Sequence, residues 1–171
     1  MLFETISGRK LDLRDIQPKD IDIFDIAHSL SRQCRFSGHC VEFYSVAQHS
    51  LRVAALLPTE LKMVGLLHDA AEAYLGDITR PVKELFPGIE VIEKAIWRSI
   101  AKRWCLPDEL PQEVVDADNL ILQVELMELC PAHKQDEVKI EIPPAAAVEK
   151  ILTPREAQEQ FINLFRELVM L

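Results

Sequence analysis

The sequence has 171 residues, 49% of them hydrophobic, and this length and composition predict one globular domain with a substantial core. Its formal net charge of -9 argues against a nucleic-acid polymer as a partner, because binding to a phosphate backbone draws on clustered Lys and Arg. A small phosphorylated ligand remains compatible with this charge, since a single local cation can neutralise it.

Cysteine usage and hydropathy indicate a cytoplasmic protein. The four cysteines form no CxxC pair and are too few for a disulfide scaffold, so we expect free thiols in a reducing compartment. The first residues, MLFETISGRKLDL, are too polar for a signal peptide, and no uncharged stretch approaches the ~20 residues of a membrane helix. We therefore expect neither secretion nor membrane insertion.

The N-terminal part of the chain predicts a peripheral hairpin followed by two helices. Residues 3–13 alternate apolar and polar side chains around a Ser-Gly pair, which is typical of a short hairpin or an extended arm. Apolar residues recur at helical intervals in 21–34 and in 45–57, and the second of these segments contains His49. The stretch RFSGHCVEFY between them loses this period and is expected to be a loop.

The central segment 66–83, LLHDAAEAYLGDITRPVK, sets a His-Asp pair into an apolar helical run. On a helix His68 and Asp69 occupy adjacent sectors, and Glu72, four residues on, returns to the face of His68. Buried polar groups need partners, and a divalent cation would satisfy both members of the pair. Taken alone, the pair is better explained as a hydrogen-bonded core pair or a solvated helix edge.

The ends of the predicted helices carry local signals. Thr59 is expected to cap the central helix and Gly76 to end it, while Pro81 suits the first turn of a short helix that follows. Residues 88–104 present one apolar face and are expected to pack as a helix.

The last third of the chain predicts one long helix, one strand and one docking helix. Residues 114–129 form a broad apolar helical surface, and VKIEIPP within 131–144 alternates like a short edge strand. Thr153 is expected to cap a final helix that docks on the bundle. These elements together predict an all-α bundle.

Three of the predicted helices offer metal-ligating side chains in apolar surroundings. His49, His68, Asp69 and Asp118 make a set of two imidazoles and two carboxylates, which suits Mn, Fe, Co, Ni or Zn better than calcium. Asp116, two residues before Asp118, is a competing ligand.

This H…HD…D order and the strings RFSGH, EFYSVAQHS, LLHDAAEAYLGDITRPVK and ADNLILQVE resemble the HD-domain metal-dependent phosphohydrolases. The similarity is to the small phage-type and bacterial branch that includes 5'-deoxynucleotidases, and it runs from about residue 23 to about residue 128. It implies one HD-type domain over 1–171, with a catalytic core at about 21–130 and a loop plus docking helix at 131–171.

The resemblance also implies the metal and its ligands. One divalent transition metal is expected, Mn, Co, Zn, Fe or Ni in preference to Mg, on His49, His68, Asp69 and Asp118. Asp118 is preferred to Asp116 because a glutamate seven residues after it, in ADNLILQVE, is similar to the family motif.

The function expected from these residues is hydrolysis of a phosphate monoester by a metal-bound hydroxide, with a 5'-(deoxy)nucleotide monophosphate as the substrate that the resemblance implies. Glu72 is expected to orient or deprotonate the water. Asp77 is expected to hold a sugar hydroxyl or to support Glu72, and it could also cap the next helix. A homodimer is implied by the resemblance alone.

Two residues of the RFSGH loop are candidates for substrate binding. The planar guanidinium of Arg35 suits a phosphate, although a surface ion pair is the commoner fate of an arginine, and Arg32 is the alternative one turn earlier. His39 could touch the substrate, extend the metal set or hydrogen-bond within the loop.

Two other functions remain open from the sequence. The chain could be a noncatalytic or regulatory nucleotide-binding HD module, or an oxygenase with two irons. The intact ligand set with Glu72 argues against the first, and metal content discriminates the second, since one ion per chain favours the hydrolase.

Overall fold

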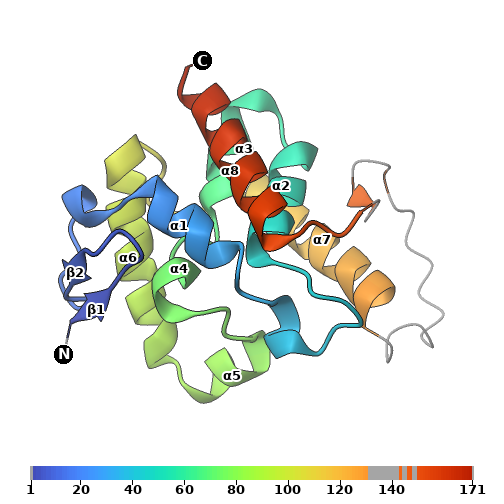
Figure 1. Ribbon diagram of the computed structural model, residues 1–171, viewed down its shortest axis with the longest axis horizontal. Coiled ribbons are helices and arrows are strands. Elements are labelled where there is room, and N and C mark those ends of the chain that lie inside the picture. The colour runs from blue at the N-terminus through green and yellow to red at the C-terminus, as the bar shows by residue number, and fades with distance from the viewer. Residues whose placement is uncertain (1, 131–142, 144–145, 148–149, 171) are drawn as a thin grey trace.

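The computed structural model describes residues 2–130, 143, 146–147 and 150–170 (Figure 1). These residues form a mostly helical structure with one two-stranded sheet, which confirms the all-α prediction. Apart from position 143, the strand expected in 131–144 lies outside the described residues. Across the described ranges, no helix combines the length and the apolar character needed to span a membrane.

The elements follow the expected order along the chain. The helices are α1 (Ile23–Leu30), α2 (Val46–Leu56), α3 (Lys62–Leu67), α4 (Glu72–Leu75), α5 (Arg80–Leu85), α6 (Gly88–Trp104), α7 (Gln112–Leu129) and α8 (Pro154–Val169). Three short 3-10 turns are η1 (Pro18–Asp20), η2 (Arg35–Gly38) and η3 (Thr59–Leu61).

The N-terminal residues form a hairpin and not an extended arm. Strands β1 (Phe3–Glu4) and β2 (Lys10–Leu11) pair in antiparallel register. The turn between them is fastened to α1, because Ser7 donates its backbone N-H and its hydroxyl to the two carboxylate oxygens of Asp25, at 3.0 and 2.8 Å. The hairpin is therefore tied to the bundle by a buried carboxylate.

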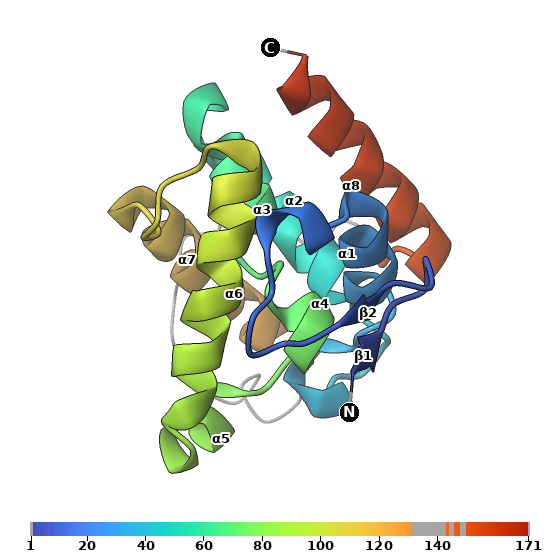
Figure 2. The same cartoon turned by 90° about the vertical axis from the view of Figure 1, so that its left-hand side faces the viewer.

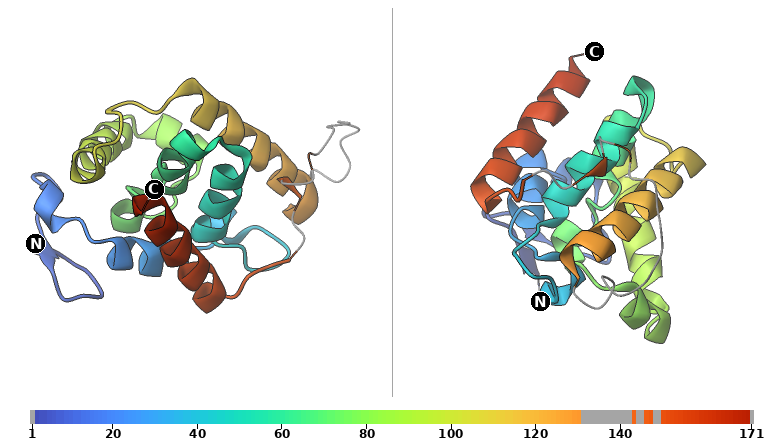
Figure 3. Two further views of the ribbon diagram at one scale, coloured as in Figure 1. Left: turned by 90° about the horizontal axis from the view of Figure 1, so that it is seen from above. Right: turned by 90° about the vertical axis from the view of Figure 1, so that its right-hand side faces the viewer.

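Helices α2 and α3 occupy the middle of the molecule. Figures 2 and 3 show them with α8 on one side and α6 and α7 on the other. Gly65 of α3 permits the close approach of α2, because a Cβ atom there would lie 3.3 Å from Ala54 Cα and would overlap the side chain of Leu57. This packing brings the helix that carries His49 against the segment that leads to His68.

The final helix docks as the sequence predicts. Thr153 accepts a hydrogen bond from Glu156 N at 3.2 Å, and Glu156 accepts one from Thr153 N at 2.8 Å, which completes a capping box. One stripe of α8, Ala157, Phe161 and Phe165, is buried where the helix meets α1, α2 and α3. The helix thus closes the core opposite α7.

Two of the expected helix-end signals are present and one is wrong. Gly76 ends α4 with a φ of 89°, and Pro81 lies in the first turn of α5. Thr59 does not cap the central helix, because it begins the turn η3, and α3 starts only at Lys62.

Asp77 does not take the alternative role of a helix cap. The N-cap position of α5 belongs to Thr79, two residues further along the chain. Asp77 therefore lies in the short connection between α4 and α5.

The central helix is interrupted at the His-Asp pair, where a continuous helix was expected. Residues 68–71 form a tighter turn, with Ala70 N bonded to Leu67 O at 2.8 Å and Glu72 N bonded to Asp69 O at 2.9 Å. Such three-residue spacing eclipses positions i and i+3. Glu72 is therefore expected on the side of Asp69. A regular α-helix would have placed it on the face of His68.

We expect Phe161→Ala to lower the free energy of unfolding by about 3–5 kcal/mol, because it removes a fully buried ring from the docking face of α8. Urea denaturation followed by circular dichroism measures the loss. Phe24→Ala, at a position 48% exposed, is the matched control and should change stability far less. Equal losses at the two positions would contradict the docking of α8.

Candidate metal centre

Four expected ligands come together from three parts of the bundle. His49 comes from α2, His68 and Asp69 from the turn after α3, and Asp118 from α7. The Nε2 atom of His49 lies 3.0 Å from Asp118 Oδ1 and 3.5 Å from Asp69 Oδ2. The Nε2 atom of His68 lies 3.3 Å from Asp69 Oδ2 and 3.8 Å from Asp118 Oδ1. Ligand atoms of His49, His68 and Asp118 all fall within 4.8 Å of one another.

The hydrogen bonds of the two imidazoles leave their Nε2 atoms free to bind a cation. His49 Nδ1 lies 2.9 Å from Glu125 Oε1, and His68 Nδ1 lies 2.7 Å from Gly65 O. A carbonyl and an ionised carboxylate only accept hydrogen bonds, so each Nδ1 carries the proton. In the neutral imidazoles, two Nε2 lone pairs then face each other at 3.3 Å. That contact is repulsive unless a cation or a proton lies between them, and the donor set fits a divalent metal.

The charges around the pair favour a cation at this place. Burial opposes a charged imidazolium, but Asp69 and Asp118 nevertheless raise the pKa of His68 well above its ordinary value. The pKa of Asp118 is lowered, since its hydrogen bonds with His49 and His68 outweigh the effect of its own burial. The two carboxylates therefore favour a positive charge between the imidazoles, whether a proton or a metal ion.

The geometry distinguishes the two aspartates of α7. Asp116 is exposed and accepts a hydrogen bond from Gln112 Nε2 at 2.9 Å, one turn earlier on the same helix. Asp118 instead lies 3.0 Å from His49 Nε2. Residues two apart on a helix point in nearly opposite directions, so α7 can present only one of them to the imidazoles.

Glu125 supports the proposed ligand His49, and no role was predicted for Glu125 from the sequence. It is fully buried, and besides His49 it accepts from Arg35 Nε at 3.0 Å and from Arg52 Nη1 at 3.4 Å. Burial opposes its ionisation, yet His49 and Arg35 lower its pKa. The signal for it was present, because Asp118 lies seven residues earlier, two helical turns along the same face of an apolar helix.

Arg35 is buried beside the ligand set and does not form the surface ion pair that was the alternative expectation. Its Nε donates to Glu125, and its Nη1 lies 3.7 Å from Asp69 Oδ2. Burial opposes the charge of the guanidinium, but Glu125, Asp69 and Asp77 raise its pKa further. Arg35 therefore stays charged beside the proposed ligand set.

Glu72 has the environment of a carboxyl group that can exchange a proton. It is buried, its Oε2 atom has no hydrogen-bond partner among the described residues, and its Oε1 lies 3.5 Å from Lys83 Nζ. Burial raises its pKa well above the ordinary value, and the nearby carboxylates of Asp69 and Asp77 raise it further. Lys83, which sequence reasoning did not single out, also pairs with Glu93 at 2.7 Å.

A pocket of about 570 Å³ opens from the ligands toward α6. His68, Asp69 and Glu72 line one part of it, and Lys83 and Trp97 line another. The indole N-H of Trp97 is buried without a hydrogen-bond partner in the part of the chain that the structure describes. The pocket thus offers both charged groups and an aromatic wall next to His68 and Asp69.

Asp77 is positioned through Gln33. The side chain of Gln33 accepts from Asp77 N at 2.8 Å and donates to Glu72 O at 3.0 Å, which ties the segment after α1 to the connection after α4. Burial raises the pKa of Asp77, while Arg35 lowers it and Asp69 raises it. Asp77 therefore lies within electrostatic reach of Arg35 and Asp69.

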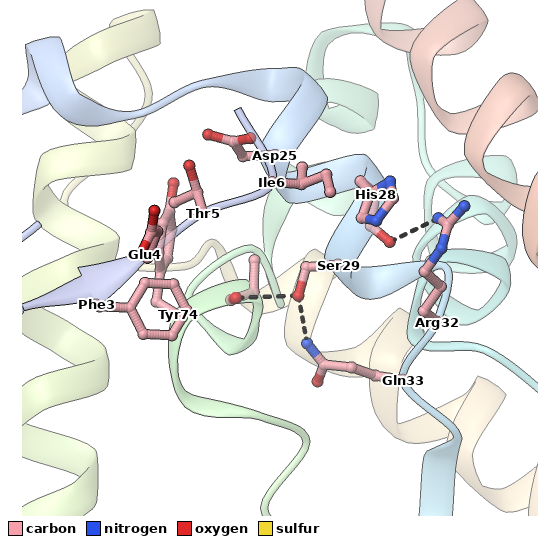
Figure 4. Close-up of a pocket in the computed structure, with 11 residues that line it drawn as sticks. Phe3, Glu4, Thr5, Ile6, Asp25, His28, Ser29, Arg32, Gln33 and Tyr74 are labelled. Atoms are coloured by element: carbon pink, nitrogen blue, oxygen red, sulfur yellow. Dashed lines mark hydrogen bonds between the residues drawn. The ribbon is translucent and has the colours of Figure 1, made fainter. Parts of the chain in front are cut away.

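Arg32 and His39 are not brought to the ligand set. Arg32 lines a different pocket, of about 300 Å³, together with Phe3 and Tyr74, and it donates to His28 O at 3.0 Å (Figure 4). The side chain of His39 is exposed at the end of η2. Of the two arginines, only Arg35 lies beside the ligands.

No family model matches this chain. The chain is 36% identical over 167 residues to a protein of Escherichia coli K12 named "Uncharacterized protein YfdR", with 96% of this chain and 94% of that protein aligned. It is 38% identical over 119 residues to "Uncharacterized protein RCAP_rcc00048" of Rhodobacter capsulatus, an alignment that spans 64% of this chain and 61% of that protein. Because the first alignment extends over nearly the whole of both proteins, this chain belongs to the family of the Escherichia coli protein YfdR.

Proposed function

We propose that this protein is a metal-dependent phosphohydrolase of the HD type that cleaves phosphate monoesters. The observation that carries the proposal is the meeting of two Nε2 atoms and two carboxylates near the buried carboxyl group of Glu72, whose Oε2 has no hydrogen-bond partner among the described residues. Two imidazole nitrogens at 3.3 Å need a proton or a metal ion between them, and the buried carboxyl group of Glu72 near that position suits proton transfer.

In the proposed reaction, each residue has one role. His49, His68, Asp69 and Asp118 would hold the cation, and a divalent cation bound there would lower the pKa of its water and polarise the phosphoryl group. Glu72 accepts a proton from the attacking water, and burial, which raises the pKa of its carboxyl group, makes its carboxylate a stronger base. The guanidinium of Arg35 neutralises phosphate charge from its place beside Asp69, while its Nε remains on Glu125.

The proposed substrate is a 5'-nucleotide monophosphate, the class that the resemblance to HD-type nucleotidases implies. A pocket of about 570 Å³ lies within the size range of small-molecule sites, and Trp97 gives it an aromatic wall. A noncatalytic nucleotide-binding module would use the same cation and pocket, but it would have no use for a carboxyl group of raised pKa next to the ligands.

The direct test is a phosphate-release screen over nucleotides and other phosphate esters. The purified chain is stripped with a chelator and reloaded separately with Mn, Co, Zn, Fe, Ni and Mg. We expect release from monophosphates with at least one transition metal and none from the stripped protein. Binding of nucleotides without phosphate release under every metal would favour the noncatalytic module, and two irons per chain would favour the oxygenase.

Asp118→Ala and His68→Ala should each lose bound metal, because the remaining ligands hold a cation too weakly. Metal content after dialysis, measured by plasma mass spectrometry, reports this directly. Asp116→Ala is the matched control on the same helix and should retain the metal, since Asp116 bonds to Gln112 and not to the imidazoles. Loss of metal from the Asp116 variant alone would exchange the roles of the two aspartates.

Glu72→Gln should keep the metal and lower kcat by ~10²- to 10⁴-fold, because an amide cannot accept the proton of the attacking water. The amide keeps the size of the side chain, and a circular dichroism spectrum that matches the wild type excludes misfolding as the cause of the loss. Turnover near that of the wild type would remove Glu72 from the mechanism and direct attention to Asp77.

Arg35→Lys should raise the Michaelis constant for a phosphate monoester with metal content intact. The planar guanidinium can donate to Glu125 and to a phosphate at the same time, whereas the single ammonium group of lysine cannot reproduce both contacts. Steady-state kinetics on metal-loaded protein measures the change. Arg32→Lys is the control and should behave like the wild type, since Arg32 lines the other pocket. An effect confined to Arg32→Lys would move the phosphate site to α1.

A further inference from the structure

We propose that Cys34 and Cys40 are a redox modification site, at which a peroxide oxidant joins the two side chains in an intramolecular disulfide. Their Sγ atoms lie 3.5 Å apart as free thiols, and both side chains are partly accessible. A disulfide bond is ~2.05 Å long, so the two sulfurs need to approach by only ~1.5 Å. This proposal does not depend on the proposed phosphohydrolase activity.

The backbone of η2 is built to hold the two thiols together. Between them the chain reverses through Phe36, Ser37 and Gly38, all with positive φ, at 56°, 52° and 81°. Left-handed conformations are uncommon for residues with a Cβ atom, and two in succession persist only where the surroundings impose them. Because of this conformation, Cys34 and Cys40, six positions apart in the chain, lie close together.

Both ends of the turn are anchored to helices. Arg35 N bonds to Tyr44 O at 2.9 Å, and Cys34 forms a bridge with Ser45 at the start of α2. On the other side, Val41 N bonds to Leu129 O of α7 at 2.9 Å. These backbone contacts therefore hold both cysteines close to each other.

The two cysteines have different roles in the proposed reaction. Burial and the hydrogen bond with Cys34 raise the pKa of Cys40 to about 11, so we assign the first attack to Cys34 and the second to Cys40. The Cys34 thiolate attacks one oxygen of hydrogen peroxide, the O–O bond breaks, and a sulfenic acid and hydroxide form. The Cys40 sulfur then attacks Cys34, the S–O bond breaks, and water leaves. Two thiols lose two electrons and two protons, and peroxide becomes two waters.

The modification would act on a residue of the metal centre. Arg35 lies inside the ring that the disulfide closes, and its carbonyl oxygen is the acceptor of the Cys40 thiol at 3.9 Å. In oxidising the pair, peroxide removes that donor and tightens the turn that carries the guanidinium. In a reducing compartment such a bond is transient, which is typical of disulfides that sense oxidants.

The test is a peptide map of the reduced full-length chain after brief exposure to hydrogen peroxide. Remaining thiols are blocked with N-ethylmaleimide before trypsin digestion, which cleaves after Arg35 and leaves QCR and FSGHCVEFYSVAQHSLR as separate peptides. We expect these two peptides to appear joined, at the sum of their masses less two hydrogens, from protein that runs as a monomer on a non-reducing gel. Dithiothreitol should abolish the joined species.

The decisive measurement is on the unsubstituted chain, so a variant that fails to fold cannot obscure it. Cys40→Ser should lose the joined peptides, and Cys105→Ser is the matched control that should keep them, because Cys105 is exposed at the end of α6. The proposal is overturned if Cys105 is oxidised while Cys34 and Cys40 are both recovered with the blocking group. It is also overturned if Cys40 is recovered joined to Cys130.

Discussion

The structure depends on one buried charge, the carboxylate of Glu125. An ionised carboxyl group removed from water costs several kcal/mol unless it is paired and hydrogen-bonded. Glu125 meets that requirement with His49 of α2, Arg35 of η2 and Arg52 of α2, three donors from segments more than 70 residues earlier in the chain. Satisfying this single group therefore fixes how α7 lies against α2 and against the turn η2.

The same interaction orients the proposed metal ligands. By accepting from His49 Nδ1, Glu125 directs the Nε2 lone pair toward His68, while Gly65 O does the same for the second imidazole. Two imidazole nitrogens arranged in this way need a proton or a metal ion between them. If the proposed metal binds there, its binding is coupled to folding, because the groups that hold the bundle together also orient the proposed ligands.

The proposed substrate side of the ligand set is assembled from short connections instead of long helices. The turn at 68–71 replaces one helical turn, the connection after Gly76 carries Asp77, and η2 carries Arg35. Gln33 links two of these pieces through its amide, which donates to Glu72 O and accepts from Asp77 N. Each connection is short and hydrogen-bonded to the rest of the fold, so the side chains proposed to contact a substrate are held in fixed positions.

The sequence by itself determined the all-α class, most helix bounds and the residue types able to bind a metal. These follow from local signals, such as the apolar period of 88–104, the capping box at Thr153 and the glycine that ends α4. Only the tertiary structure decided that Asp118 and not Asp116 meets the imidazoles, that Arg35 lies beside them while Arg32 lines another pocket, and that Glu125 and Lys83 belong to the site. It also decided that the central helix breaks at His68. The physical reason is that a period or a cap involves neighbours in sequence, whereas the partner of a buried charge is set by distances between segments far apart in the chain.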